Sequence, residues 1–189
     1  KENLRIKYPQ FEKIILMASR ITVEKNFELA LRAMKSIVGK YPKTGLIIAG
    51  SGPLLEKYKR MSRGFRLEKN VIFELWSNDL PSHYKTADLF LLTSNYEGYG
   101  RTIIEAMAAG LPPLMTDVGC AGEIVKDGIN GMVFPVKNKR ILLEKIKHFF
   151  DDNEFRERIK KGVKETDLKV PTKEKYLKLY EKNWRDCIK

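Results

Sequence analysis

Two segments of the chain carry residue types suited to a phosphorylated ligand. Arg20 and Lys25 could neutralise a diphosphate, Arg through a two-pronged hydrogen-bond fork and Lys as a point charge. In a chain with 36 Lys and Arg residues, a pair of ordinary surface cations is a strong alternative. Gly50 and Gly52 form a short glycine turn, where the backbone could approach a ligand closely. Taken alone, each segment is a weak signal of a binding site.

The third segment, residues 93–112, is the most informative. Glycines at positions 98 and 100 make a turn without side chains, and a helix is predicted to begin near Arg101. The free backbone N–H groups at the start of that helix would form an anion site. Glu97 and Glu105 could accept hydrogen bonds from sugar hydroxyl groups. The alternative is structural: Glu97 as a loop acid, and Glu105 as an acid that interacts with the helix dipole or with a cation.

Short apolar runs alternate with helical patterns along most of the chain. Continuous apolar runs are typical of strands buried on both faces of a parallel sheet, and they are found at residues 14–18, 46–49, 71–73, 89–92, 113–115 and 131–134. Apolar residues at helical spacing predict helices over 27–38, 54–61, 80–87, 101–109 and 121–125. The sequence therefore predicts an α/β fold, a doubly wound parallel sheet of about six strands with helices on both faces.

The last quarter of the chain has no strand signal and contains amphipathic helical patterns. We expect a ligand-binding domain over residues 1–150 and C-terminal helices over 151–189 that pack on the same domain. A third helix of this tail is predicted to begin near Pro171. In a doubly wound sheet the ligand binds beyond the carboxyl ends of the strands, which is where the three polar segments lie.

Several classes of protein are disfavoured. The glycine turn at residues 50–53 lacks the third glycine of the dinucleotide fingerprint, and the chain has no GxxxxGK-S/T phosphate loop, so neither an NAD enzyme nor a P-loop kinase is expected. His83 and His148 have no Cys or His neighbour at zinc spacing, so no metal site is predicted. No apolar stretch reaches the roughly 18 residues of a membrane span.

The net charge of +12 has two interpretations. One is an anionic partner, such as nucleic acid, a phosphorylated substrate or an anionic membrane surface. The other is general solvation, which we favour for most lysines because they are spread along the chain among Glu residues. A nucleic-acid binder would show a basic helix or an aromatic-studded strand, and neither is found. Binding to an anionic membrane remains a hypothesis that only the lysine content motivates.

The cysteine content and the first residue of the chain indicate its cellular compartment and its relation to a longer protein. Cys120 and Cys187 are too few for a disulfide framework, which favours a reducing cytoplasm. We therefore expect a cytoplasmic protein, located at the inner membrane surface if the lipid hypothesis holds. The chain begins at Lys1 without an initiating Met, so we expect a piece of a longer protein.

The stretch EGYGRTIIEAMAAGLP, in which Glu97 and Glu105 are separated by seven residues, resembles a known signature. It is similar to that of the retaining glycosyltransferases of group 1, or family 4, which include glycogen and sucrose synthases. Four further segments agree with this family in order and spacing: SRITVEKN, LIIAGSGP, YKTADLFLLTS and TDVGCAGEIVKDGINGMVFP. The resemblance covers roughly residues 13 to 150, and five motifs in order are far more specific than one.

The resemblance implies the C-terminal, donor-binding half of a GT-B fold, a Rossmann-like domain whose N-terminal acceptor domain is absent from this chain. It implies metal-independent, retaining transfer of a hexose from a UDP- or GDP-linked donor to an acceptor hydroxyl, as in polysaccharide biosynthesis, with no cofactor. Arg20 and Lys25 would hold the diphosphate, and Glu97 would contact the transferred sugar. The remaining donor-binding residues would be Gly50, Gly52, Leu75, Trp76, Gly98, Tyr99, Gly100, Arg101, Thr102 and Glu105, with Leu75 and Trp76 near the base and Glu105 at the ribose.

Some positions depart from the family pattern. Ser19 and Asn26 stand where the family prefers Gly, and the segment 73–76 lacks the usual Gly after Phe73, which puts base recognition in doubt. Three alternatives stay open: a nucleotide-sugar 2-epimerase of the same fold, a nucleotide-binding module without catalysis, and, least favoured, a nucleic-acid binder. The sequence does not name the base, the sugar or the acceptor.

Overall fold

A computed structural model describes residues 3–75, 79–168 and 173–187 of the 189-residue chain. Its centre is a six-stranded sheet in which all neighbouring strands are parallel, in the order β3-β2-β1-β4-β5-β6. The strands are β1 (Lys13–Ala18), β2 (Thr44–Ala49), β3 (Val71–Glu74), β4 (Leu89–Leu92), β5 (Pro113–Thr116) and β6 (Met132–Phe134). The predicted doubly wound sheet is therefore confirmed.

Strand order reverses between β1 and β4, where Ile15 pairs with Leu89 and Leu16 with Phe90. The chain first builds outward through β2 and β3, and then returns to the other side of β1 to add β4, β5 and β6. At such a reversal the loops that leave the two central strands diverge to opposite faces of the sheet and open a crevice between them. This topology places the exits of β1 and β4 side by side.

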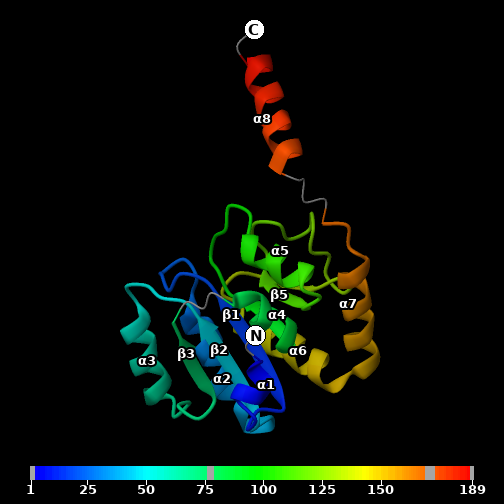
Figure 1. The fold of residues 1–189 in the computed structure, drawn as a ribbon. Helices are drawn as coiled ribbons and strands as arrows, with labels where there is room; N and C mark the ends of the chain where they lie inside the picture. The colour runs from blue at the N-terminus through cyan, green and yellow to red at the C-terminus, as the bar shows by residue number, and fades with distance from the viewer. Residues whose placement is uncertain (1–2, 76–78, 169–172, 188–189) are drawn as a thin grey trace.

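Helices cover the sheet in two groups (Figure 1). On one side α2 (Phe27–Lys40) contacts α3 (Leu55–Gly64) and α6 (Lys139–Asp151). The other group contains α1 (Leu4–Lys7), α4 (Leu80–Thr86), α5 (Arg101–Ala108) and α7 (Asn153–Glu165), and α7 also contacts α6. Because both faces are covered, β2, β4 and β5 are buried along their whole length, as their continuous apolar sequences predict.

Two local predictions differ from the structure. Residues 121–125 form no helix; instead Ala121 and Val125 pair in an isolated parallel bridge. Gly122 has a φ of +78°, which an α-helix does not allow, and this explains the difference. The short helix α1 was not predicted; Asn3 begins it by accepting a hydrogen bond from Arg5 N at 2.9 Å.

The C-terminal helices differ from each other. Helix α7 packs as expected, with Phe155, Ile159 and Val163 buried. Helix α8 (Lys173–Cys187) buries none of its residues, and Figure 1 shows it extending away from the sheet. Its packing on the domain is therefore not seen, and the expected division at residue 150 stays a prediction. The proposed start of this helix at Pro171 lies outside the described residues.

A polar cluster around the largely buried carboxylate of Glu74 ties α1 and α4 to the end of β3. The carboxylate of Glu74 accepts hydrogen bonds from Tyr8 and from His83, whose Nε2 lies 2.7 Å from Oε2, and Lys7 Nζ lies 2.9 Å from Oε1. Burial alone would raise the pKa of Glu74, but the hydrogen bonds from His83, Tyr8 and Lys7 outweigh it and lower the pKa to about 2. His83 is fully buried, and its Nδ1 lies 3.2 Å from Asp79 O. The sequence had indicated a surface or packing role for this histidine, and the structure gives it a packing role with a charged partner.

Candidate functional site

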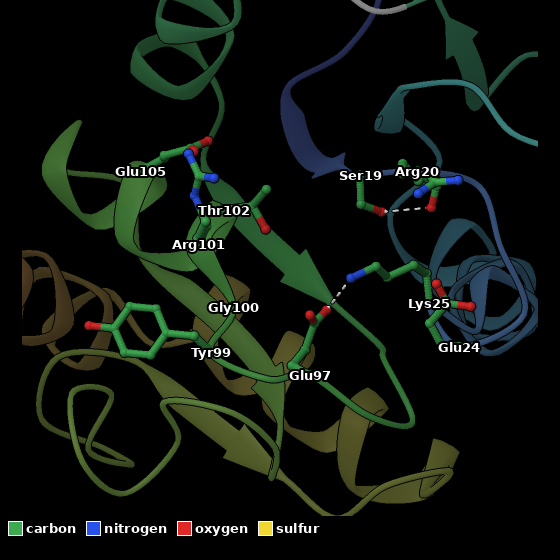
Figure 2. Close-up of a pocket in the computed structure, with 10 residues that line it drawn as sticks. All are labelled: Ser19, Arg20, Glu24, Lys25, Glu97, Tyr99, Gly100, Arg101, Thr102 and Glu105. Carbon is green, nitrogen blue, oxygen red and sulfur yellow. Dashed lines mark hydrogen bonds and ion pairs between the residues drawn. The ribbon is translucent and has the colours of Figure 1, made fainter. Parts of the chain in front are cut away.

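A cavity of about 630 Å³ lies at the carboxyl ends of β1 and β4, where strand order reverses (Figure 2). It is lined by Ser19, Arg20, Glu24, Lys25, Glu97, Tyr99, Gly100, Arg101, Thr102 and Glu105. Residues from the β1 exit form one wall, and the β4 exit with the start of α5 forms the other. Segments more than 70 positions apart in the sequence thus meet at the crevice that the topology predicts.

Eight of the predicted site residues line this cavity: Arg20, Lys25, Glu97, Tyr99, Gly100, Arg101, Thr102 and Glu105. Gly50, Gly52, Gly98 and Leu75 are not among the lining residues, and Trp76 lies outside the described residues. Leu75 is 74% exposed, so its contact with a base stays a prediction. Ser19 and Glu24 line the cavity although no role was predicted for them.

The loop after β1 is fixed to the loop after β4 by backbone hydrogen bonds. The buried Thr93 Oγ1 donates to Lys25 O or Asn26 O, each at 3.0 Å, and Asn95 N donates to Glu24 O at 2.7 Å. Asn26 adopts a left-handed conformation, with φ 47° and ψ 49°, and caps α2. Asn tolerates this conformation better than other non-glycine residues, which explains why it can replace the family's Gly here. Lys25 therefore enters the cavity from a well-fixed backbone.

Lys25 and Glu97 meet across the cavity (Figure 2). Lys25 Nζ lies 2.7 Å from Glu97 Oε1, and the two side chains are 20% and 10% exposed. The same carboxylate oxygen accepts a hydrogen bond from Ser94 Oγ at 2.7 Å. Ser94 was not predicted as a site residue, because Ser side chains in loops commonly bond nearby backbone groups and give no sequence signal for a bond to an acid.

The start of α5 presents backbone N–H groups to the cavity. Gly100 has a φ of +87° and precedes Arg101, the first residue of the helix; no side chain of the described residues caps this end. Uncapped amides and the positive end of the helix dipole favour an anion. Arg101 and Thr102, the first two residues of α5, line the cavity beside this helix end.

Glu105 is held one turn further along α5. Its Oε2 accepts a hydrogen bond from Tyr84 OH of α4 at 3.0 Å. Burial raises the pKa of Tyr84 well above its usual range, and the nearby charge of Glu105 adds to this effect. Tyr84 therefore stays a hydrogen-bond donor, and it orients the carboxylate toward the cavity that Glu105 lines. Tyr84 is a second residue that the sequence did not reveal as part of the site, because it lies on a separate helix.

The glycine turn after β2 packs against the loop that follows β1. Gly50 has a φ of +153° and donates its N–H to Glu74 O at 3.1 Å, while Ile21 N donates to Ser51 O at 2.8 Å. A Cβ atom on Gly52 would lie 2.4 Å from Ile21 O, closer than real contacts allow. These glycines allow the turn to pack against the loop that carries Arg20, and their contact with a ligand stays a prediction.

Gly52→Ala is expected to destabilise the fold by about 2 kcal/mol, because the new methyl group forces backbone apart at a site without free space. Urea denaturation of the chain measures this change. Gly39→Ala is the matched control: nothing lies within 4 Å of its Cβ position in α2, so it should stabilise the fold slightly. Equal effects of the two substitutions would contradict the close approach at Gly52.

The fold and cavity define a Rossmann-like α/β domain with a polar cavity at its switch point, one half of a GT-B fold. Residues 1–166 match the family described as glycosyl transferases group 1, and the chain belongs to this family.

Individual relatives agree with this assignment. A glycosyltransferase of Methanocaldococcus jannaschii is 34% identical over 155 residues, which are 81% of this chain and 40% of the relative. The crystal structure of the C-terminal domain of a glycosyl transferase group 1 family protein (LpcC) from Francisella tularensis superposes with a TM-score of 0.76 at 25% identity, covering 86% of this chain and 90% of that domain. A variant of S. aureus TarM, in complex with Fondaparinux, alpha-GlcNAc-glycerol and UDP, gives a TM-score of 0.81 at 26% identity, covering 89% of this chain and 35% of TarM.

The chain spans well under half the length of the curated M. jannaschii relative, and its similarity to the solved LpcC domain is to a C-terminal domain. Among the described residues, no helix is long and apolar enough to cross a membrane. Association with an anionic membrane surface, which the net charge suggested, stays a prediction.

Proposed function

We propose that the cavity binds a nucleotide-diphosphate sugar and that the chain is the donor-binding part of a glycosyltransferase that retains the anomeric configuration. The observation that carries the proposal is the convergence of Lys25, Glu97, Glu105 and the uncapped start of α5 on one cavity. The UDP in the solved TarM complex supports a nucleotide donor, since TarM shares the fold at 26% identity.

The charges in the cavity suit the two parts of such a donor. Arg20 and Arg101 form no ion pair with any of the described residues and so can turn toward phosphate oxygens. Together with Lys25 and the α5 amides they would stabilise the negative charge that develops on the departing nucleoside diphosphate. These groups supply the stabilisation that a metal ion provides in other transferases, so the proposal includes no metal and no cofactor.

Carboxylates would hold the hydroxylated parts of the donor. Glu97 at the β4 exit would accept hydrogen bonds from the transferred sugar, and Glu105, oriented by Tyr84, would accept them from the ribose. Both acids lie on the β4–α5 side, and Arg20 and Lys25 lie on the β1 side, so the diphosphate would bridge the two walls. The acceptor would then approach from a second domain across the open side of the cavity.

Titration of the chain with UDP, GDP and ADP by isothermal calorimetry tests this proposal. We expect one of the three to bind, and Arg20→Ala to weaken that binding by about tenfold, because a charge-assisted hydrogen bond to phosphate is lost. Arg60→Ala is the control, since Arg60 is an exposed arginine of α3 that does not line the cavity. Failure of all three nucleotides to bind, or equal behaviour of the two variants, would refute the proposal.

A further inference from the structure

The two oxygens of Glu97 have different environments. Oε1 is fixed on both sides, by Lys25 Nζ and by Ser94 Oγ, each at 2.7 Å. Oε2 has no hydrogen-bond partner among the described residues. The carboxylate is thus held by one oxygen, and the other is left for a ligand in the cavity that Glu97 lines.

Ser94 is itself anchored in the core. Its side chain is buried, and its carbonyl accepts a hydrogen bond at 2.7 Å from Thr116 Oγ1, a fully buried hydroxyl on β5. The position of Glu97 is therefore set by the sheet through Thr116 and Ser94. Lys25, in contrast, has a flexible side chain with three donor hydrogens, and it can exchange partners.

We propose that Ser94, Glu97 and Lys25 form a relay that makes tight binding of the diphosphate depend on the presence of the sugar. This inference rests on the proposed function of the cavity. A nucleoside diphosphate alone has to compete with Glu97 for Lys25, and when it takes Lys25 it leaves a carboxylate without its cation near the phosphate charge. A nucleotide sugar also brings hydroxyl groups that donate to Glu97. These hydroxyl groups take the place of Lys25 as donors to the carboxylate, and Lys25 is free to turn to the diphosphate. Ser94 is the positioning residue, because it keeps Glu97 within reach of both Lys25 and the sugar hydroxyl groups.

The relay predicts opposite effects for its two charged members. Removing the competing charge with Glu97→Gln should tighten the binding of UDP or GDP alone by about tenfold. Lys25→Ala should weaken the same binding. Glu97→Gln should not tighten the binding of the glucose and mannose conjugates of that nucleotide. The affinity for the conjugate divided by the affinity for the diphosphate should therefore fall. Calorimetric titration of the chain with whichever of UDP and GDP it binds, and with those conjugates, measures all of these values.

Ser94→Ala should shift the same ratio in the same direction by about threefold, since Glu97 loses one of the two donors that fix it. Ser82→Ala is the matched control: Ser82 Oγ donates to Asp79 Oδ1 at 2.7 Å, also three residues apart, but Ser82 does not line the cavity. A purely structural role for Ser94 would weaken both ligands equally and leave the ratio unchanged.

The outcomes separate the two proposals. If the diphosphate binds but Glu97→Gln weakens it as Lys25→Ala does, or if Ser94→Ala and Ser82→Ala give the same ratio, the relay is refuted and the donor site stands. If none of UDP, GDP and ADP binds the unaltered chain or any variant, the donor site is refuted and the relay with it.

Discussion

Replacement of Lys25 by alanine is expected to lower the rate of sugar transfer by about 100- to 1000-fold, the range measured when one preorganised group that stabilises developing charge is removed. The proposed reaction builds negative charge on the leaving diphosphate. Lys25 is the cation that the structure holds deepest in the cavity, with a side chain only 20% exposed and a backbone fixed by Thr93. In such a partly desolvated position a charge acts more strongly than it would in water.

The measurement requires a protein that carries this chain together with an acceptor domain, assayed with its nucleotide sugar in the presence of EDTA, because the proposed mechanism uses no metal. Lys145→Ala is the matched control. Lys145 forms a similar ion pair, at 2.7 Å from Asp127, and its side chain is 23% exposed, but it does not line the cavity. Near-normal turnover by Lys25→Ala, with an unchanged melting temperature for both variants, would contradict the role assigned to Lys25.

Glu74→Gln is expected to lower the free energy of unfolding at pH 7 by about 3 kcal/mol. The pKa of Glu74 falls from an ordinary 4.5 to about 2 in the folded chain, and each unit of such a shift corresponds to about 1.4 kcal/mol. The side chain is 9% exposed, so solvent screens the interaction little. The substitution removes a charge that His83 and Lys7 both approach, and it leaves the hydrogen-bonding groups around it without their carboxylate acceptor.

The sign of the pH dependence follows from the direction of the shift. Because the folded state lowers the pKa, the carboxylate contributes its full stabilisation above about pH 4.5 and loses it as the pH falls toward 2. The difference between the unaltered chain and Glu74→Gln should therefore be constant from pH 7 to 5 and shrink to about 1 kcal/mol at pH 3. Urea denaturation at these pH values measures it.

Glu12→Gln provides the comparison for this experiment. Glu12 also pairs with a lysine at 2.7 Å, but the pair with Lys43 is exposed, with side chains 66% and 63% accessible for Lys43 and Glu12. Exposed pairs contribute little to stability, so this substitution should leave the unfolding free energy nearly unchanged at every pH. A difference at Glu74 that persists undiminished at pH 3 would show that packing, and not charge, is what the substitution alters.

Much of the sheet was predictable because continuous apolar runs have a direct physical meaning. A run such as Leu89–Leu92 can be buried on both faces only in a covered parallel sheet, and all six predicted strands are found. The grouping of Arg20, Lys25, Glu97 and Glu105 around one cavity was predictable for a similar reason. Each follows a central strand, and carboxyl ends of parallel strands meet at one edge.

What the sequence did not reveal depends on contacts between distant segments. Tyr84 reaches Glu105 from another helix, and the burial of His83 beside Glu74 follows from the packing of α4, so neither has a local signal. The prediction of a helix at 121–125 was wrong because Gly122 has a positive φ. The sequence does not reveal the φ angle of a glycine inside an apolar pattern. The amphipathic pattern of α8 predicts a helix and says nothing about what covers its apolar side.

The strand order has a consequence for the growing chain on the ribosome. Strands β1, β2 and β3 are made first and can pair at once, but the second edge of β1 is completed only when β4, some 70 residues later, has left the exit tunnel. Until then the strand that becomes the middle of the sheet is an open, apolar edge, which is a template for pairing with another chain. In the interval between the synthesis of Ala18 and of Leu89 this edge of β1 therefore exposes the nascent protein to aggregation.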